Sequence, residues 1–251
     1  MEFNGSAARF LLAILLLPMM PDASADSSNE LSNGNFEEWD TLQGMPPSGH
    51  PAGWSQTCTN PPYQVPGLSA GSTYSVFMRP GVNNVLSQTM AGELTKFEFD
   101  FDFAALDPGR PSDRSFNVAL SQKRPDNSTS IIVNLRMVAG TSPGILSLQA
   151  YDGQDWVTVG DNLFEASVYD ESSNTFPTLN AYRISICLDL AAQSPTYSIT
   201  YQSLGSADLS TIADLTVFHT LPSGSPLSGV SLQASGSVVG YAIDNMEIVP
   251  K

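Results

Sequence analysis

Three carboxylates alternate with phenylalanines in the segment Glu98-Phe99-Asp100-Phe101-Asp102-Phe103. Successive side chains of a β-strand point to opposite faces, so Glu98, Asp100 and Asp102 share one face. Two carboxyl groups about 5–5.5 Å apart perform retaining glycoside hydrolysis. The alternation alone also predicts a structural strand, with its phenylalanines in the core and its acids in solvent. The segment is the candidate catalytic site, and we favour the structural alternative.

The elements that would position these carboxylates are strands. Apolar residues recur at every second position through most of the chain, and Gly, Pro, Ser, Asn and Asp separate these runs. This pattern predicts an all-β protein of two packed antiparallel sheets. We expect strands at Asn35–Trp39, Tyr74–Arg79, Val85–Thr89, Thr95–Ala104, Ser115–Gln122, Ile131–Val138, Ile145–Tyr151, Trp156–Val159, Tyr182–Leu190, Thr196–Gln202, Leu215–His219, Val230–Ala234 and Val239–Val249.

Two kinds of segment depart from this pattern. Thr41–Ser72 is rich in Pro and Gly and is expected to be a long irregular excursion. A short helical turn is expected at Asp161–Tyr169 or at Asp208–Asp214.

The N-terminus has the pattern of an export signal. Arg9 precedes the apolar run Phe10–Met20, and Pro21 and the small residues Ala23-Ser24-Ala25 follow it. This order is typical of a cleaved secretory signal peptide. The run is also shorter than the roughly 20 residues of a membrane-spanning helix. We therefore expect a signal peptide at residues 1–25 and one domain at residues 26–251, which is secreted or periplasmic and has no transmembrane segment.

The charge of the chain limits its partners. Its net charge of −15 at pH 7 repels nucleic acid and anionic membranes, and it argues against acidic polysaccharides. Two histidines and two cysteines do not form a zinc cluster of the usual spacing. Neutral glycans and divalent cations remain suitable partners.

Short motifs in both halves of the chain resemble a known kind of module. Leu31–Glu37 and Tyr241–Ile248 resemble the first and last strands of secreted jelly-roll modules of the carbohydrate-binding and concanavalin A-like kind. Pro51-Ala52-Gly53-Trp54 is similar to the proline-glycine-tryptophan step of carbohydrate-binding modules. Ala181–Leu190, followed by Thr196–Thr200, looks like a strand pair of concanavalin A-like lectin and glucanase domains. The resemblance implies a two-sheet antiparallel jelly-roll sandwich whose terminal strands lie side by side.

A structural calcium ion is part of what the resemblance implies. Glu37 matches the glutamate of an Asn-Gly-x-Phe-Glu motif, and Asp244 matches the aspartate of the last strand. Calcium binds six to eight oxygens, which carboxylates and backbone carbonyls supply together. Asp244 shares its strand face with apolar residues, where an unpaired carboxylate is costly. The alternative is a hydrogen-bonded Asp244 and a solvated Glu37.

The resemblance also gives roles to the acidic strand. Glu98 would be the nucleophile, Asp100 the assisting residue and Asp102 the acid/base of a glycoside hydrolase or lyase. Asp102 stands where such enzymes carry a glutamate, and its shorter side chain widens the gap between the two carboxyl groups.

Aromatic residues of the irregular segment are candidates for sugar binding. Trp54 and Tyr63 flank Asn60, and sugar sites combine aromatic faces with amides that bind hydroxyls. Long loops on rigid scaffolds often carry function. Packing in the core is the alternative for both rings.

Cys58 and Cys187 are the two cysteines. Disulfides persist in exported proteins, so the two residues are a candidate disulfide. Two free thiols that lie far apart are the alternative.

These observations favour a secreted, non-catalytic module that binds an extracellular or envelope polysaccharide and that calcium stabilises. One alternative is a glycoside hydrolase or lyase that uses Glu98, Asp100 and Asp102. Another is a structural matrix protein without a sugar site. Fold-level analogy is the main support for glycan binding.

Overall fold

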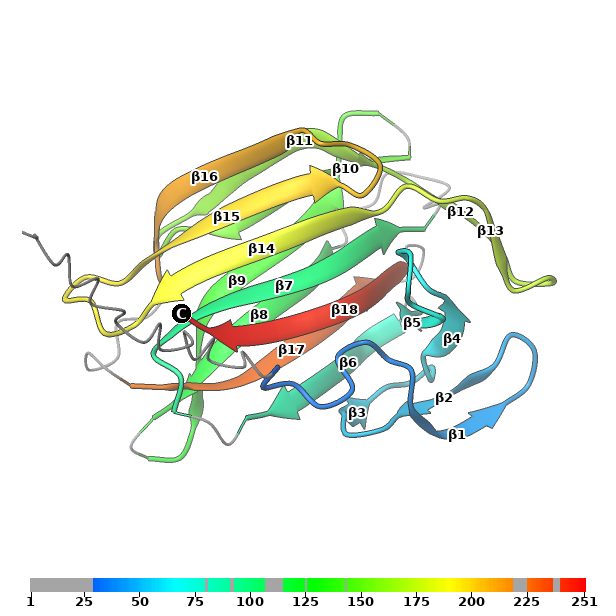
Figure 1. Ribbon diagram of the computed structural model, residues 1–251, viewed down its shortest axis with the longest axis horizontal. Coiled ribbons are helices and arrows are strands. Elements are labelled where there is room, and N and C mark those ends of the chain that lie inside the picture. The colour runs from blue at the N-terminus through cyan, green and yellow to red at the C-terminus, as the bar shows by residue number, and fades with distance from the viewer. Residues whose placement is uncertain are drawn as a thin grey trace, which may run out of the picture.

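Two antiparallel sheets and one small hairpin make up the described part of the chain (Figure 1). The computed structural model describes residues 29–79, 81–90, 93–106, 115–124, 126–142, 144–218, 225–236 and 240–251. The expected signal peptide, residues 1–25, lies outside the described residues. The described residues contain no helix long and apolar enough to cross a membrane.

The front sheet, which Figure 1 shows nearest the viewer, has nine strands in the order β1-β2-β4-β5-β18-β7-β14-β15-β16. Its strands are β1 Trp39–Gln43, β2 Ser48–Pro51, β4 Tyr63–Pro66, β5 Tyr74–Met78, β7 Lys96–Ala105, β14 Tyr182–Asp189, β15 Thr196–Ser203, β16 Leu209–Thr216 and β18 Tyr241–Pro250.

The back sheet has seven strands in the order β11-β10-β9-β8-β17-β6-β3. Its strands are β3 Ser55–Thr57, β6 Gly81–Thr89, β8 Ser115–Lys123, β9 Thr129–Ala139, β10 Ile145–Tyr151, β11 Trp156–Glu165 and β17 Leu227–Gly236. Strand β17 inserts between β6 and β8, which places residues more than 100 positions apart side by side.

The main core lies between the two sheets, where the alternation of β7 places its aromatic side chains. Phe97, Phe99, Phe101 and Phe103 are at most 1% exposed. The ring of Phe103 lies 5.9 Å from that of Phe116 on β8, so the aromatic face of the front sheet packs directly on the back sheet. The predicted two-sheet antiparallel sandwich is thereby confirmed.

A second, smaller apolar cluster covers one end of the outer face of the front sheet. It contains Tyr63, Val65, Leu68, Phe77, Ala104, Leu106, Ala181 and Ala242. The hairpin of β12 (Val168–Asp170) and β13 (Thr175–Thr178) packs Tyr169 and Phe176 against it. That end of the front sheet is therefore not open to solvent.

Several expected element boundaries were wrong. The segment Thr41–Ser72 contains β2, β3 and β4, and each of these strands has only three or four residues. Such short strands have too few positions for an alternating pattern to be visible in the sequence. Their strand conformation depends instead on pairing with neighbouring strands. The chain from 32 to 35 is a turn, where a strand was expected.

The two expected helical turns are also strands. Asp161–Tyr169 contains the end of β11 and the start of β12, and Asp208–Asp214 lies mostly in β16. A strand was expected at Leu215–His219. The observed strand is β16, which begins at Leu209 and ends at Thr216. Both segments are strands because they pair with a neighbour, β11 with β10 and β16 with β15.

Candidate functional site

The acidic face of β7 points away from the core, and Asp102 is buried on it. The Asp102 carboxylate is 0% exposed. Arg183 Nε lies 2.8 Å from Asp102 Oδ1 and its Nη2 3.1 Å from Oδ2, and Asn245 Nδ2 donates to Oδ2 at 2.8 Å. The expectation that Asp102 lies in solvent was wrong, because β14 and β18 place these donors beside it.

The other two acids of β7 do not complete a carboxylate pair. Glu98 forms an ion pair with Lys251. Burial raises the pKa of Asp100, against a hydrogen bond from Ser185 that lowers it. With Asp102 held by Arg183 on both oxygens, the geometry favours the structural alternative for this strand.

The two predicted calcium ligands both bind one loop, the β4–β5 turn at residues 67–74. Asp244 accepts from Leu68 N at 2.9 Å and from Asn245 N at 2.7 Å. Glu37 Oε1 accepts from Thr73 N at 2.7 Å and from Tyr74 N at 3.0 Å. The N–H donors occupy oxygens that a cation would need.

These contacts favour a structural role of Glu37 and Asp244 over calcium coordination. Among the described residues, no group of three or more His, Cys, Asp or Glu side chains could hold a metal ion. Burial raises the pKa of Asp244 to about 6, against hydrogen bonds from Ser72, Leu68 and Asn245 that lower it. The sequence left open the alternative of a hydrogen-bonded Asp244. The structure has this arrangement, with the backbone N–H groups of Leu68 and Asn245 as donors.

The terminal segments are nevertheless neighbours, as the resemblance implied. Met246 N donates to Gly34 O at 2.9 Å, and Glu30 N donates to Ile248 O at 3.0 Å. A side chain at Gly34 would collide with the Met246 carbonyl, which explains the glycine there. The chain near residue 34 thus lies along β18 although it is a turn.

The predicted sugar-binding aromatics are buried and lie apart. Trp54 is 2% exposed in the main core, where its ring centroid lies 5.2 Å from that of Phe36. Tyr63 is 8% exposed in the outer cluster of the front sheet, with the Arg79 guanidinium 4.3 Å from its ring centroid. Asn60 is half-buried, and its backbone N–H donates to Asn84 Oδ1. Both rings are thus packed in apolar clusters, which is the alternative that the sequence left open for them.

The two cysteines are free in the structure. Cys58 follows β3 of the back sheet, where its Sγ donates to Val85 O at 3.6 Å. Cys187 is exposed on β14 of the front sheet, opposite Glu98. Burial raises the pKa of both thiols, and Glu98 adds to the effect at Cys187. The structure therefore has the alternative of two free thiols, with Cys187 exposed on the front sheet and Cys58 hydrogen-bonded to Val85 O beside the back sheet.

A different surface, the outer face of the back sheet, combines the groups that bind sugars. A depression crosses it, which we call the trough. Its floor is one register row of small side chains, one from each successive strand: Ser87 on β6, Ser231 on β17, Ala119 on β8 and Asn134 on β9. Two hollows of about 290 and about 400 Å³ lie along it and share Ser231 and Ile131.

One wall of the trough is a row of three amides and one guanidinium. Gln233, Asn117, Arg136 and Gln149 lie opposite one another on β17, β8, β9 and β10. Arg136 Nε donates to Gln149 Oε1 at 2.7 Å, which fixes both side chains. Side-chain amides carry both donors and acceptors, as hydroxyl groups do. The wall can therefore form paired hydrogen bonds with a polyol.

An aromatic residue closes one end of the trough. Trp156 on β11 is half-buried and lines the same hollow as Asn134 and Arg136. The Arg136 guanidinium lies 4.0 Å from the Trp156 ring centroid, and the Tyr151 ring meets it edge-on at 5.4 Å. The Arg136 guanidinium thus covers one face of the indole, and the half-buried ring keeps part of its surface exposed at the end of the trough.

The floor of the trough contains an unsatisfied acceptor. Asn134 Oδ1 is buried and finds no hydrogen-bond partner among the described residues. A buried polar atom without a partner costs about 1–3 kcal/mol.

The described lining of the trough carries two positive charges and no carboxylate, although the chain as a whole is strongly acidic. Among the described residues that line its two hollows, the charged ones are Lys123 and Arg136, and none is a carboxylate. The chain as a whole carries −15 at pH 7. The polar lining of the trough suits a ligand rich in hydroxyl groups, and the net negative charge of the chain disfavours a strongly acidic one.

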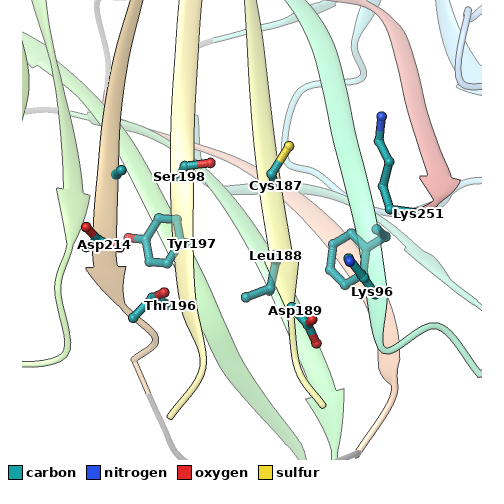
Figure 2. A pocket seen from close by; sticks show the side chains of 11 residues that line it. Lys96, Cys187, Leu188, Asp189, Thr196, Tyr197, Ser198, Asp214 and Lys251 are labelled. Atoms are coloured by element: carbon teal, nitrogen blue, oxygen red, sulfur yellow. The ribbon is translucent and has the colours of Figure 1, made fainter. Parts of the chain in front are cut away.

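A hollow of about 590 Å³ on the front sheet has a different character (Figure 2). Lys96 and Lys251 lie on one side of it and Asp214 of β16 on the other, with Ser198 and Cys187 between them. Its walls carry both signs of charge, and no exposed aromatic face lines it. Its chemistry is that of a charged surface and differs from that of the trough.

Sequence reasoning did not identify the polar residues of the trough, although strands β8 and β17 carry a signal. In β8, Asn117, Ala119 and Ser121 alternate with buried apolar residues, and in β17 Ser231 and Gln233 do the same. Small residues and amides at outward positions mark a recessed polar face. Only the strand order shows that these positions form one row.

No protein-family model and no curated protein matches the sequence. Among solved structures, the chain is similar to the VIP36 exoplasmic/lumenal domain in its Ca²⁺/Man2-bound form, with 10% identity and a TM-score of 0.48 over 88% of this chain and 90% of that one. Basic winged bean lectin, solved with Tn-antigen, is similar at 13% identity and a TM-score of 0.43, over 78% of this chain and 91% of that one.

An engineered GH43 glycoside hydrolase is also similar, at 10% identity and a TM-score of 0.44, over 92% of this chain and 43% of that one. Likeness at these values carries no inference about ligand, metal or catalysis. The sandwich described above rests on the strand pairing of the chain itself.

Proposed function

We propose that this protein binds a neutral glycan in the trough and does not cleave it. The observation that carries the proposal is the amide wall of Asn117, Gln233 and Gln149, which ends at the Trp156–Arg136 stack. Amides bind hydroxyl groups, and an indole ring stacks on sugar rings. The volume of the two hollows together falls in the range of ordinary ligand pockets.

Binding without cleavage follows from where the carboxylates lie. Glycoside hydrolysis needs two carboxyl groups that flank the scissile bond. No carboxylate is among the described residues that line the trough. The acidic row Glu98, Asp100 and Asp102 lies on the opposite sheet, where Glu98 pairs with Lys251 and Asp102 pairs with Arg183.

The export pattern at residues 1–25 indicates where the ligand would be met. An exported protein would encounter an extracellular or envelope polysaccharide, and the negative charge of this chain disfavours acidic ones. We therefore expect a neutral polysaccharide as the partner.

The test is retention on insoluble neutral polysaccharides and binding to a panel of neutral and acidic oligosaccharides. We expect binding to at least one neutral glycan and no release of reducing sugar. Trp156→Ala should weaken this binding about tenfold or more, because an aromatic contact that anchors a ligand is typically worth about 1.4 kcal/mol or more.

Glu98→Gln, on the other sheet, is the matched control and should bind like the wild type. The proposal is overturned if the protein binds no neutral glycan, or if Glu98→Gln abolishes binding while Trp156→Ala leaves it intact. Release of reducing sugar that Glu98→Gln abolishes would establish the enzyme instead.

A further inference from the structure

Strand β16 is an end strand of the front sheet. Figure 1 shows it at the upper border of this sheet, and among the described residues its strand partner is β15 alone. An end strand has N–H and C=O groups along its free side that no neighbouring strand binds. Outside the ladder with β15, the described residues form no backbone hydrogen bond with β16. Its free side is therefore available to a further strand.

The other three end strands of the two sheets are protected against such pairing. Strand β1 has a register shift after Trp39 and carries Asp40. Strand β3 has only three residues. Strand β11 has two register shifts against β10 and carries Asp161 and Glu165. Bulges, charged side chains and short length all hinder the addition of a strand.

The first half of β16 has none of these protections. The stretch Leu209–Ile212, which we call the open edge, pairs with Ile199–Gln202 in regular register. The register shift comes after it, where Asp214 has a φ of +59°. The open edge contains no charged residue, and Leu209 is 62% exposed. A regular, uncharged and exposed edge is the kind to which an extended peptide pairs.

The inner side of the open edge is incompletely buried. Ile212 is half-buried, and its side chain packs against the main core between the sheets. Side chains at every second position of an added strand would point to the same side of the sheet as Ile212. Apolar residues at those positions would complete the burial of Ile212 and gain from the removal of apolar surface from water.

Carboxylates flank the open edge at both ends. Asp208 precedes it and Asp214 follows it, and both are exposed. Neither forms an ion pair with another described residue. Strands β15 and β16 contain no basic residue. The open edge therefore lies between two negative charges that have no cation beside them on these strands.

These charges distinguish between two possible occupants of the open edge. In a second copy of the chain, paired antiparallel across Thr211, Asp208 of each copy would lie toward Asp214 of the other. Like charges opposite each other on paired strands are destabilising, whereas opposite charges stabilise the pair. A segment with a basic residue at each end would place opposite charges there. The charge of the flanks thus favours a basic-ended partner over a second copy.

We propose that the open edge binds an extended segment of a partner protein as an added antiparallel strand. The segment has apolar residues at every second position and lysine or arginine at both ends. Its backbone pairs with Leu209–Ile212, its apolar side chains cover Ile212, and its basic ends lie against Asp208 and Asp214. The orientation is antiparallel because all ladders of the front sheet are antiparallel and such pairs are slightly more stable. This binding does not involve the trough, so it is independent of the proposed function.

The test uses a synthetic peptide of alternating valine and threonine with two lysines at each end, acetylated and amidated. Calorimetric titration should show saturable binding of one peptide per chain. Glutamates in place of the lysines should weaken binding about tenfold or more. A proline at the centre of the peptide should abolish binding, because proline lacks the N–H that a ladder needs. Hydrogen exchange should slow in Leu209–Ile212 when the peptide binds, and should not change in β1.

A matched pair of variants locates the binding. Leu209→Lys places a positive charge on the open edge and should weaken peptide binding about tenfold or more. Leu42→Lys is the control, because Leu42 is 41% exposed on β1 at the opposite border of the same sheet, and it should bind like the wild type. If Leu209→Lys does not fold, the double variant Asp208→Asn, Asp214→Asn replaces it and should weaken binding to a similar extent.

Three results would refute the proposal. The first is that the lysine-ended peptide does not bind to the wild type. The second is that the open-edge variant binds the peptide as tightly as the wild type, or that Leu42→Lys weakens binding equally. The third is that sedimentation of the protein alone shows a dimer that Leu209→Lys dissociates, because the open edge then takes a second copy.

Discussion

Replacing Arg183 with methionine removes the cation that holds the buried carboxylate of Asp102. The carboxylate is 0% exposed, and Arg183 binds both of its oxygens, at 2.8 and 3.1 Å. The hydrogen bond from Asn245 Nδ2 to Asp102 remains in the variant. Methionine keeps a long apolar side chain at the position, so the change removes the charge and its hydrogen bonds with little loss of packing.

We expect a loss of about 3 kcal/mol in the free energy of unfolding. Breaking one partner of a buried ion pair costs about 3–5 kcal/mol, since the remaining charge is left uncompensated. The lower end applies here, because the Arg183 side chain is 43% exposed and water screens part of the interaction. For a protein of this size the loss corresponds to a fall of about 6–12 °C in Tm.

The assay is urea unfolding followed by circular dichroism, together with calorimetric Tm. Lys251→Met is the control: its ion pair with Glu98 has side chains 47% and 23% exposed, so its loss should cost less than about 1 kcal/mol. Adding Asp102→Asn to Arg183→Met should recover part of the stability, because the buried charge is then gone. A loss below about 1 kcal/mol for Arg183→Met would refute the reasoning that Asp102 is buried and charged.

Three further predictions concern Asp244, the calcium site and the thiols. The pKa of Asp244 is raised from 3.8 to about 6 in the folded state, so its contribution to stability is full below pH 3.8 and is lost as the pH rises through 6. The free energy of unfolding should fall by about 3 kcal/mol over this pH range because of Asp244. Asp244→Asn should abolish this part of the pH dependence, and a variant with the same pH dependence as the wild type would contradict the raised pKa. Chelation with EDTA should leave the Tm unchanged, because backbone donors occupy Glu37 and Asp244; a fall that added calcium reverses would restore the calcium site. Both thiols should be free by mass spectrometry under non-reducing conditions, and a thiol reagent should modify the exposed Cys187 before the partly buried Cys58; a disulfide between them would contradict the structure.

The sequence by itself determined the class of the fold and the two faces of each long strand. Alternation of Phe97, Phe99, Phe101 and Phe103 with charged residues was enough to assign the inner face of β7, because side chains of a strand point to opposite sides. It also predicted two packed sheets, because every long segment has one apolar face that must be covered. These properties are local, so spacing along the chain reveals them.

The tertiary structure decided which side chains share a surface. The alternating pattern places Asp102 on the outer face of β7. Arg183 and Asn245, which are 81 and 143 residues away in the sequence, nevertheless enclose its carboxylate. The trough exists because β17 pairs between β6 and β8, which aligns Ser231 with Ala119 and Ser87. The alternating pattern of a strand shows to which face of the sheet a side chain points. Which other side chains it contacts on that face depends on the order and register of strands that are distant in sequence. That order results from the packing of the whole chain.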